Sequence, residues 1–426
     1  MEKIMNKVLI IGSGGREHTL AYKISNDKFV EEVHCIPGNG GTLELAKNYD
    51  IDIYDFDSIY RYVKEKGIDV IVVGPEGPLN EGIVDFFKDR NIEIFGPDKF
   101  ASQLEGSKLF ARKFMSKNNI PQPKYFECDN IEDAYKIKKD LGLPIVLKAD
   151  GLASGKGVFI CHSEQDFEEA LSELFVNKKF GEASDKISIE ECLVGEELSI
   201  FAICDGSDYK IIGDAQDHKR VFDGDKGGNT GGMGAYSPTK ICTPQLLENV
   251  ENNIIKPTLK GIADEGHPYL GFLYVGLMIV EERPYVIEFN VRMGDPETQV
   301  VIPRLKTSLF KLIKESIKGK LKDLPIHFSD ETYITVVLAS KGYPDKYKKG
   351  QKISLDKIKQ NSGAGFIFHA GTIYSNSNLL VAGGRVLNVV SYGSNLRNGI
   401  KNVYAQIENI KFEGMYYRKD IGQKGL

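Results

Sequence analysis

The stretch Arg283–Gln299, RPYVIEFNVRMGDPETQ, is the part of this 426-residue chain that decides the expected fold. It begins with an alternating run at Tyr285–Asn290, which predicts a β-strand. Side chains alternate between the two faces of a strand, so Glu288 and Asn290 lie on the same face. A carboxylate beside an amide oxygen offers the hard ligands that Mg²⁺ takes when substrate phosphates complete its octahedron, and Arg292 can neutralise a carboxylate or a transferring phosphoryl group. Alone, this pattern also fits an edge strand with a surface salt bridge, so the rest of the chain has to supply the partners of a phosphate site.

The composition is that of an ordinary soluble protein with about two to four domains. Hydrophobic residues make up 41% of the chain and charged residues 27%, and the net charge of −5 gives no reason to expect nucleic acid or a membrane as partner. The six cysteines are scattered without a C-x-x-C pair, which is typical of reduced thiols. The N-terminus leads directly into a strand, and no apolar run is long enough to span a bilayer. We therefore expect a cytoplasmic protein.

A buried strand at Val8–Ile11 leads into the glycine-rich turn GSGGREH at residues 12–18 and then into a helical pattern. A strand, a glycine-rich turn and a helix N-terminus together favour a phosphate site. A dinucleotide fingerprint would need glycine at position 17, where the chain has Glu17, so a nicotinamide cofactor is disfavoured. The guanidinium of Arg16 suits a phosphate monoester or a ribose better, with a solvated helix start as the alternative.

Two further strands end in comparable loops, PGNGGT at residues 37–42 and GPEGPL at residues 74–79. Ligands of an open α/β sheet bind beyond the carboxyl ends of the strands, so these loops and the first one are expected to share a pocket. A short strand at 92–95 closes this first α/β domain.

A strand at Pro144–Ala149 carries Lys148 between apolar neighbours, and the small-residue loop DGLASGKG follows at residues 150–157. Backbone N–H groups of such a loop can face phosphates. A Walker A motif would need glycine at 150 and serine or threonine at 157, where the chain has Asp150 and Gly157. The pattern therefore predicts a mobile lid within a hairpin, and a surface lysine is the alternative interpretation of Lys148.

The acidic stretch EECLVGEE at residues 190–197 predicts a crossover between two strands, whose free backbone groups suit an adenine edge. Glu197 can accept hydrogen bonds from a ribose, although a solvated hairpin also fits. A polar stretch at 214–220 and a polar, glycine-rich stretch at 223–236 follow, and their combined length without apolar periodicity favours a functional loop. His218 in the first of them is a candidate catalytic residue.

With these residues in view, the chain resembles the ATP-grasp superfamily and, within it, the phosphoribosylamine–glycine ligases. The resemblance runs along the chain through GSGGREH, PGN, GPE, EGSK, KADGLASGKGV, DHKR, NTGGMGAYSP, EFNVRMGDPETQ, FHAGT, GGRVL and YRKDIG. Other ATP-grasp ligases lack the combination of NTGGMGAYSP, GREH and GDPETQ. Gly228 stands where the family has proline, Met293 where phenylalanine is usual and Gly40 where alanine is common. None of these departures removes a charged or ligand residue.

The resemblance implies an α/β ATP-grasp fold in three domains. These are an N-terminal open parallel-sheet domain at 1–104, an ATP-grasp domain at 105–320 with a lid subdomain at about 121–193, and a C-terminal β-rich α+β domain at 321–426. It implies ATP-dependent ligation of glycine to 5-phosphoribosylamine through a glycyl phosphate, with Mg²⁺ or Mn²⁺, in the second step of purine synthesis. We expect a monomer, and the single-function form because the chain ends after this unit.

The resemblance also assigns roles to individual residues. Glu288 and Asn290 are expected to hold the metal, and Arg292 and Asp295 to be catalytic. Asp214 and Asp295 are candidates for binding the ammonium of glycine. The residues expected to bind ATP are Lys108, Lys148, Gly151, Ser154, Gly155, Lys156, Gly157, Glu190, Leu193 and Glu197. The residues expected to bind the other substrates are Gly14, Gly15, Arg16, Glu17, Pro37, Gly38, Asn39, Gly74, Pro75, Glu76, Asp214, His218 and Gly294.

Three alternatives compete with this interpretation. Another ATP-grasp carboxylate–amine ligase, a peptide-type ligase or a carboxylase of the purine pathway would share the metal pair and the lysines but not NTGGMGAYSP. A non-catalytic nucleotide sensor on the same scaffold would lack metal or phosphate ligands, all of which are present here. A Rossmann dehydrogenase would need an acidic residue about 20 positions after its glycine-rich turn, and no clear one exists.

Overall fold

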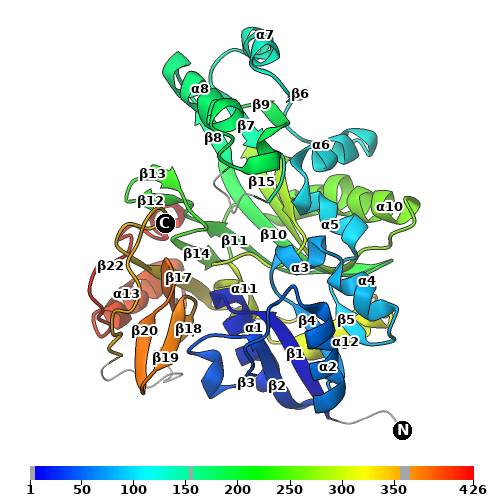
Figure 1. Cartoon of the computed structure of the whole chain (residues 1–426), viewed down its shortest axis with the longest axis vertical. Helices are drawn as coiled ribbons and strands as arrows, with labels where there is room; N and C mark the ends of the chain where they lie inside the picture. Colours follow the sequence, from blue (N-terminus) through cyan, green and yellow to red (C-terminus); the bar gives the residue numbers. More distant parts are fainter. Residues whose placement is uncertain (1–4, 153–156, 356–364) are drawn as a thin grey trace.

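The computed structural model describes residues 5–152, 157–355 and 365–426, and it has the expected α/β architecture (Figure 1). A parallel sheet built from the N-terminal part lies beside a long antiparallel sheet, and a small antiparallel sheet projects at the top of the view. The predicted ATP-binding residues Ser154, Gly155 and Lys156 lie outside the described residues. None of the described helices combines the length and the apolar character that crossing a membrane requires.

The N-terminal sheet is parallel throughout, with the strand order β3-β2-β1-β4-β5. Its strands are β1 Asn6–Gly12, β2 Val30–Pro37, β3 Lys47–Asn48, β4 Val70–Val73 and β5 Glu93–Phe95. The helices of this part are α1 Gly15–Ser25, α2 Phe56–Lys66, α3 Glu76–Asn80 and α4 Ile83–Lys88. The apolar run at 8–11 is fully buried, because a parallel strand is covered on both faces. Since the strands are parallel, β1, β2 and β4 all end at the same edge of the sheet.

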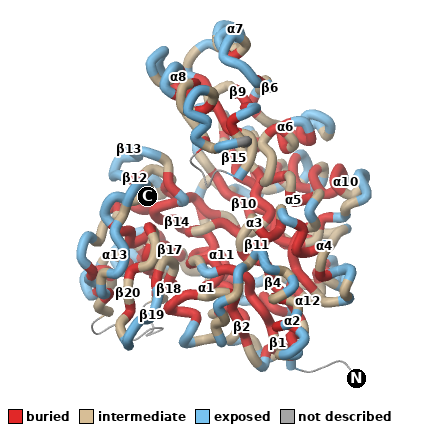
Figure 2. Tube along the Cα trace, viewed as in Figure 1, coloured by how far each residue is buried: buried red, intermediate tan, exposed pale blue. Residues whose placement is uncertain are grey.

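The small sheet, which we call the lid sheet, has the order β6-β9-β7-β8 with antiparallel neighbours. It consists of β6 Tyr125–Cys128, β7 Ile145–Ala149, β8 Val158–Cys161 and β9 Ile187–Glu191. Ala134 of α7 (Ile131–Leu141) and Phe167 of α8 (Glu164–Leu171) belong to its buried cluster. Figure 2 shows that the outer surfaces of these two helices are exposed. The predicted hairpin is present, with Lys148 of β7 opposite Val158 of β8.

The large sheet is antiparallel, with the order β16-β15-β10-β11-β14-β17-β21-β18 and β22 beside β17. Its strands are β10 Glu196–Asp205, β11 Tyr209–Asp217, β14 Gly234–Ser237, β15 Leu270–Val280, β16 Arg283–Asn290, β17 Thr332–Ser340, β18 Gly365–His369, β21 Arg385–Gly393 and β22 Met415–Tyr416. Two small hairpins, β12 Arg220–Phe222 with β13 Lys226–Asn229 and β19 Thr372–Ser375 with β20 Asn378–Val381, lie outside it. The remaining helices are α5 Lys99–Gly106, α6 Lys108–Lys117, α9 Pro244–Val250, α10 Lys256–Asp264, α11 Thr298–Arg304, α12 Leu309–Ile317 and α13 Leu396–Ile407. Because β14 pairs with β17, this sheet crosses the predicted boundary at 320, and the three-domain division stays a prediction.

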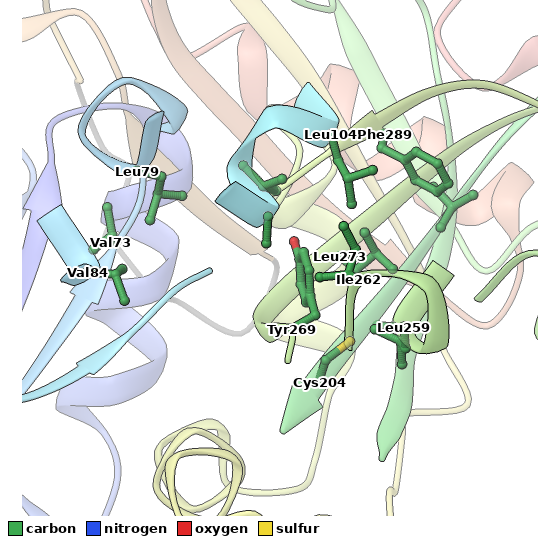
Figure 3. Packing of buried hydrophobic residues seen from close by; sticks show 14 of the residues in the cluster. Val73, Leu79, Val84, Leu104, Cys204, Leu259, Ile262, Tyr269, Leu273 and Phe289 are labelled. Atoms are coloured by element: carbon green, nitrogen blue, oxygen red, sulfur yellow. The ribbon is translucent and has the colours of Figure 1, made fainter. Parts of the chain in front are cut away.

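One buried apolar cluster joins the N-terminal part to the large sheet (Figure 3). Val73 and Leu79 come from the N-terminal part, Leu104 from α5, and Leu273 and Phe289 from β15 and β16. Full burial of a side chain of this size contributes about 1.5–3 kcal/mol. The cluster therefore holds the loops of the parallel sheet at a fixed position relative to β16.

Candidate active site

A cavity of about 1240 Å³ lies where the lid sheet, the large sheet and the ends of the parallel strands meet. Gly14 after β1, Pro37 at the end of β2 and Glu76 at the start of α3 line it, as expected at the carboxyl ends of the strands of an open sheet. The C-terminal part reaches the same cavity through Arg385 and Lys424. This volume exceeds the range of about 300–1,000 Å³ that is usual for one small ligand, so it suits several co-substrates.

Strand β16 presents Glu288 and Asn290 to this cavity, while Phe289 between them is buried in the core. On the neighbouring strand β15, Gly276 is opposite Glu288 and Leu277 is opposite Val286, so Ile287 is the extra residue of a β-bulge. The bulge turns the carbonyl oxygen of Ile287 toward the lid sheet, where it accepts a hydrogen bond from Lys148 Nζ at 3.0 Å.

Glu288 is ionised in this setting. Burial would raise the pKa of its carboxyl, but nearby cations, Lys219 first among them, lower it to about 2. A charged carboxylate beside the Asn290 amide is a donor set that fits a divalent cation whose other ligands are phosphate oxygens and water. In the described parts of the chain, no group of three or more His, Cys, Asp or Glu side chains is arranged to hold a metal ion. The chemistry of this pair therefore fits a metal that is shared with a phosphate substrate.

Lys219 links two acidic residues of the cavity wall. Its Nζ lies 2.9 Å from Glu197 Oε2 and 3.4 Å from Glu288 Oε1. The three side chains join the start of β10, the segment after β11 and the end of β16. Lys219 thus neutralises part of the negative charge beside the predicted metal pair.

A buried ion cluster fastens the lid sheet to the rest of the molecule. Arg112 on α6 donates to Glu190 Oε1 at 2.8 Å and Oε2 at 2.6 Å, and Lys148 Nζ lies 3.0 Å from Glu190 Oε2. Ser188 Oγ donates to Glu190 Oε1 at 2.9 Å. Together these contacts occupy the four lone-pair positions of the Glu190 carboxylate. Its side chain therefore positions Lys148, and the adenine contact that the resemblance implies for Glu190 stays a prediction.

Arg292 is held between two carboxylates. Its Nε donates to Glu76 Oε2 at 3.0 Å and its Nη2 to Glu105 Oε1 at 2.6 Å. Burial raises the pKa of Glu105 to about 7 despite the charge of Arg292. The other Glu105 oxygen accepts from the backbone N–H of Val291 at 2.7 Å, so α5 fixes both the backbone and the side chain at the end of β16.

The first glycine-rich loop is braced against the same segment. Arg16 Nε donates to Glu17 Oε1 at 2.6 Å, and Arg16 Nη1 donates to the Met293 carbonyl at 3.1 Å. The backbone N–H of Arg16 donates to Asp295 Oδ2 at 3.2 Å. At Gly12, where φ is +122°, a Cβ would lie 2.5 Å from the Cγ of Glu17. Only glycine fits this turn.

The structure brings together residues predicted from stretches that are far apart in the sequence. The predicted residues that line the cavity are Gly14, Arg16, Glu17, Pro37, Pro75, Glu76, Lys108, Lys148, Gly151, Gly157, Glu190, Leu193, Glu197, Glu288, Asn290, Arg292, Gly294 and Asp295. Those that do not line it are Gly15, Gly38, Asn39, Gly74, Asp214 and His218. The Asn39 side chain instead donates to the carbonyls of Ser13 and His369, both at 2.8 Å, and so ties two loops to β18.

Two of the residues outside the cavity lining, Asp214 and His218, have backbone partners instead. Asp214 accepts a hydrogen bond from the backbone N–H of Thr239 at 2.6 Å, within the wall of the sheet. His218 accepts from the backbone N–H of Gly422 at 3.2 Å, and burial lowers its pKa to about 3. Neither side chain lines the cavity, because each is held by a backbone N–H group of a segment remote in the sequence.

Several cavity residues were missed by sequence reasoning. Lys219 and Asp217 stand in the DHKR motif, and Glu297 stands in GDPETQ, so the motifs themselves were the available signal. Glu105 stands in the EGSK motif. Arg112 is not part of the cavity lining but holds Glu190, and its place within an amphipathic helix gives no sequence signal of this role.

A small lid sheet and a large antiparallel sheet that close on one cavity define an ATP-grasp protein. Solved structures of low sequence identity share this fold. The biotin carboxylase domain of the Hydrogenobacter thermophilus 2-oxoglutarate carboxylase, determined with MgADP and bicarbonate, has a TM-score of 0.75 and 16% identity. The likeness covers 97% of this chain and 91% of that one.

Family models for phosphoribosylglycinamide synthetase match three successive segments. The N domain matches residues 6–105, the ATP-grasp domain 106–298 and the C domain 333–424. The chain belongs to the phosphoribosylglycinamide synthetase family. It is 42% identical to the phosphoribosylamine–glycine ligase of Caldanaerobacter subterraneus subsp. tengcongensis, over 97% of this chain and 99% of that one. The crystal structure of the Thermotoga maritima phosphoribosylamine–glycine ligase has a TM-score of 0.85 and 34% identity, over 97% of this chain and 100% of that one.

Proposed function

We propose that this protein ligates glycine to 5-phosphoribosylamine with ATP, giving glycinamide ribonucleotide, ADP and phosphate in purine synthesis. One observation carries the proposal. A single cavity unites the loops of the parallel sheet, Lys108 and Lys148, and the Glu288–Asn290 pair, in a chain that matches the family over residues 6–298 and 333–424. The named relatives support the choice of substrates.

ATP binds between the lid sheet and the large sheet in this proposal. Lys108 at the N-terminus of α6 and Lys148 on β7 contact its phosphates, and the backbone near Leu193 contacts adenine. Burial lowers the pKa of Lys148 to about 8, while Glu190 opposes that shift, so the ammonium stays charged at neutral pH. Glu197 is available to the ribose, with Lys219 holding its carboxylate in place.

Glu288 and Asn290 would hold a divalent metal ion, with Mg²⁺ and Mn²⁺ as the candidates. When bound, the metal supplies neutralising charge between the phosphates and the incoming carboxylate. The guanidinium of Arg292 also neutralises the charge that develops during phosphoryl transfer. Glu76 and Glu105 fix its position before any substrate binds.

Two bond exchanges complete the reaction. A carboxylate oxygen of glycine attacks the γ-phosphorus of ATP, and the bond to ADP breaks, which leaves glycyl phosphate. The amine of phosphoribosylamine then attacks the acyl carbon, phosphate leaves, and the nitrogen loses a proton as the amide forms. The lid sheet covers the cavity during these steps and keeps water from hydrolysing glycyl phosphate.

The sugar phosphate binds against the loops of the parallel sheet. Arg16 provides the guanidinium for its 5-phosphate, and Glu17 and Glu76 provide oxygen acceptors for hydroxyl and amino groups. Asn39 stays outside the cavity lining and fixes the loop geometry. The reacting amine then lies on the side of the cavity where Arg292 and Gly294 follow the metal-bearing strand β16.

ADP release with ATP, Mg²⁺ and glycine, with and without phosphoribosylamine generated in situ, tests the proposal. We expect ADP only when glycine and the amine are both present, and mass spectrometry should show the amide product. ADP release that ignores glycine but responds to another carboxylate would reject these substrates and keep the ATP-grasp assignment. A cytoplasmic location, a monomeric state and a preference for Mg²⁺ over Mn²⁺ stay predictions.

A further inference from the structure

A hairpin that belongs to none of the larger sheets forms part of the cavity wall. Its strands β12 and β13 pair with each other and with no other strand of the described chain. Residues 222–228 at its tip are exposed. An isolated two-stranded hairpin is marginally stable in water, so this one depends on contacts with other parts of the chain. The cavity is nevertheless lined by residues of the hairpin and of the turn after it, namely Arg220, Asp225, Asn229, Thr230 and Gly231.

The C-terminal segment 416–420 provides these contacts, and Figure 1 shows the hairpin beside this end of the chain. Four hydrogen bonds join the two parts: from Tyr416 Oη to the Val221 carbonyl at 2.8 Å, from Arg418 Nη1 to the Arg220 carbonyl at 3.0 Å, from the Gly224 N–H to Asp420 Oδ2 at 2.8 Å and from the Lys419 N–H to Asp223 Oδ1 at 2.8 Å. The segment thus holds β12 and the turn that follows it.

Arg418 is the central residue of this contact. Only 1% of it is exposed, and its Nε and Nη2 donate to the two carboxylate oxygens of Asp420, each at 2.7 Å. Its Nη1 donates to Asp225 Oδ1 at 2.8 Å as well as to the Arg220 carbonyl. The guanidinium therefore joins its own segment to the hairpin at two points. A lysine has a single nitrogen and cannot make the paired contact with Asp420 together with both hairpin contacts.

The base of the hairpin fixes the backbone of Lys219. The N–H and the Oγ1 of Thr230 both donate to the Lys219 carbonyl at 2.8 Å, and Lys219 directly precedes β12. The Nζ of Lys219 lies 2.9 Å from Glu197 Oε2 and 3.4 Å from Glu288 Oε1. A hairpin that left the C-terminal segment would therefore move the cation that neutralises Glu288 of the predicted metal pair.

Arg418 itself is not among the residues that line the cavity. Any influence of Arg418 on the substrates therefore passes through the hairpin, which reaches the cavity beside Lys219. In the proposed function, this part of the cavity receives ATP and the metal, whereas the sugar phosphate binds against the loops of the parallel sheet.

We propose that Arg418 is a positioning residue for the nucleotide and its metal: it docks the β12–β13 hairpin on segment 416–420 and so holds Lys219 beside Glu288. The inference rests on the proposed function, which assigns ATP and the metal to this part of the cavity. A nucleotide that binds best beside the docked hairpin also stabilises the docked state, because the two equilibria are linked.

Steady-state kinetics of Arg418→Lys test the assignment, with Arg397→Lys on the exposed face of α13 as the matched control in the same part of the chain. The test variant should raise the KM for ATP about 10- to 100-fold, the range for losing hydrogen bonds to charged groups. The Mg²⁺ concentration at half-maximal turnover should rise with it. The KM for glycine and for phosphoribosylamine should change less than about threefold, and the control should match the wild type.

An unchanged KM for ATP, or equal increases in the KM for all three substrates, would assign Arg418 a merely structural role and overturn the inference. Absence of glycine-dependent ADP release in the wild-type protein would instead overturn the proposed function. ATP binding and the state of the hairpin stay measurable in that case, so the two failures are distinguishable.

Limited trypsin digestion of the wild-type protein does not depend on whether the variant folds. Lys226 is exposed at the tip of the hairpin, and a protease cleaves there only when the local backbone leaves its paired conformation. Saturating ATP with Mg²⁺ should slow cleavage after Lys226 at least about fivefold, the lower end of the usual coupling between two sites. Glycine alone should leave the rate unchanged.

The same digestion separates docking by Arg418 from direct covering of the hairpin by the nucleotide. Without nucleotide, Arg418→Lys should be cleaved after Lys226 at least about fivefold faster than the wild type, and Arg397→Lys should be cleaved at the wild-type rate. Mass spectrometry of the fragments identifies the cleaved bond. A wild-type cleavage rate that saturating ATP does not change, or equal rates in the wild type and a folded Arg418→Lys, would overturn the inference.

Discussion

Replacing Glu190 by glutamine removes one charge from the buried cluster that fastens the lid sheet, at nearly constant volume. Glu190 is 1% exposed and joins Arg112 on α6 to Lys148 on β7. Burial opposes its ionisation, but Lys148 and Arg112 lower its pKa from the ordinary 4.5 to about 2. That shift corresponds to about 3 kcal/mol. Breaking a buried ion pair by removing one partner typically costs about 3–5 kcal/mol, so both arguments give the same magnitude.

The assay is calorimetric unfolding at pH 7.5, combined with the KM for ATP. At about 2–4 °C per kcal/mol for a unit of about 150–250 residues, the size of the predicted ATP-grasp domain at 105–320, the Glu190→Gln transition should fall by about 6–12 °C. The KM for ATP should rise because Lys148 loses the partner that orients it. The control is Glu127→Gln, which breaks the exposed pair between Glu127 on β6 and Lys113 on α6, a contact between the same two parts of the fold. An exposed pair contributes at most about 1 kcal/mol, so the control should lose less than about 3 °C.

The pH dependence gives an independent check with a defined sign. The pKa of Glu190 is lowered in the folded protein, so its contribution is fully present above pH 4.5 and is lost as the pH falls toward about 2. The difference between wild type and variant should therefore shrink over that window and not above it. A variant within about 1 °C of the wild type at pH 7.5, with an unchanged KM for ATP, would refute the reasoning.

Three further predictions concern the metal pair, the sugar-phosphate loop and the contact between α1 and β18. Glu288→Gln should lower metal-dependent turnover at least about 100-fold, because it removes the charge of a predicted metal ligand. The melting temperature should stay within a few degrees, because the side-chain volume is kept. Turnover near the wild-type rate would contradict the metal assignment. Arg16→Ala should raise the KM for phosphoribosylamine far more than the KM for ATP, and equal increases would move Arg16 out of the sugar-phosphate site. His18 Nδ1 accepts from the backbone N–H of His369 at 2.8 Å, and burial lowers the pKa of both histidines, that of His369 to about 4. The unfolded chain therefore binds more protons below pH 6.5, and the wild type should lose up to about 1.4 kcal/mol per pH unit and histidine between pH 6.5 and 5. His369→Gln should show a shallower loss in the same calorimetric series, and an identical slope would argue against this linkage.

Local sequence patterns predicted much of the fold and of the cavity. The apolar run at Val8–Ile11 predicted a buried parallel strand, and the alternation at Tyr285–Asn290 predicted which side chains of β16 share a face. Both predictions rest on the side-chain period of a strand, which depends only on backbone geometry. The bulge at Ile287 was not predicted, because a register shift depends on the partner strand.

Long-range contacts explain why some of the predicted residues do not line the cavity. Asp214 and His218 lie in a polar, glycine-rich region that suggested a site, yet their partners are Thr239 and Gly422, which no local pattern connects to them. Arg112, a helix residue 78 positions away, donates to the Glu190 carboxylate, a contact that no local pattern predicts.

The sequence by itself determined the strands, the glycine-rich turns, the metal-type pair on β16 and membership in a family whose motifs are local. Only the tertiary structure decided which charged groups are already neutralised by protein partners and which are still free. Arg112 forms an ion pair with Glu190, whereas the carboxyl groups of Asp217 and Glu297 have no ion-pair partner among the described residues. In the sequence, all four are ordinary charged residues. The physical reason is that burial and ion pairing depend on distances between elements remote in the chain, and these distances exist only after the sheets have closed around the cavity.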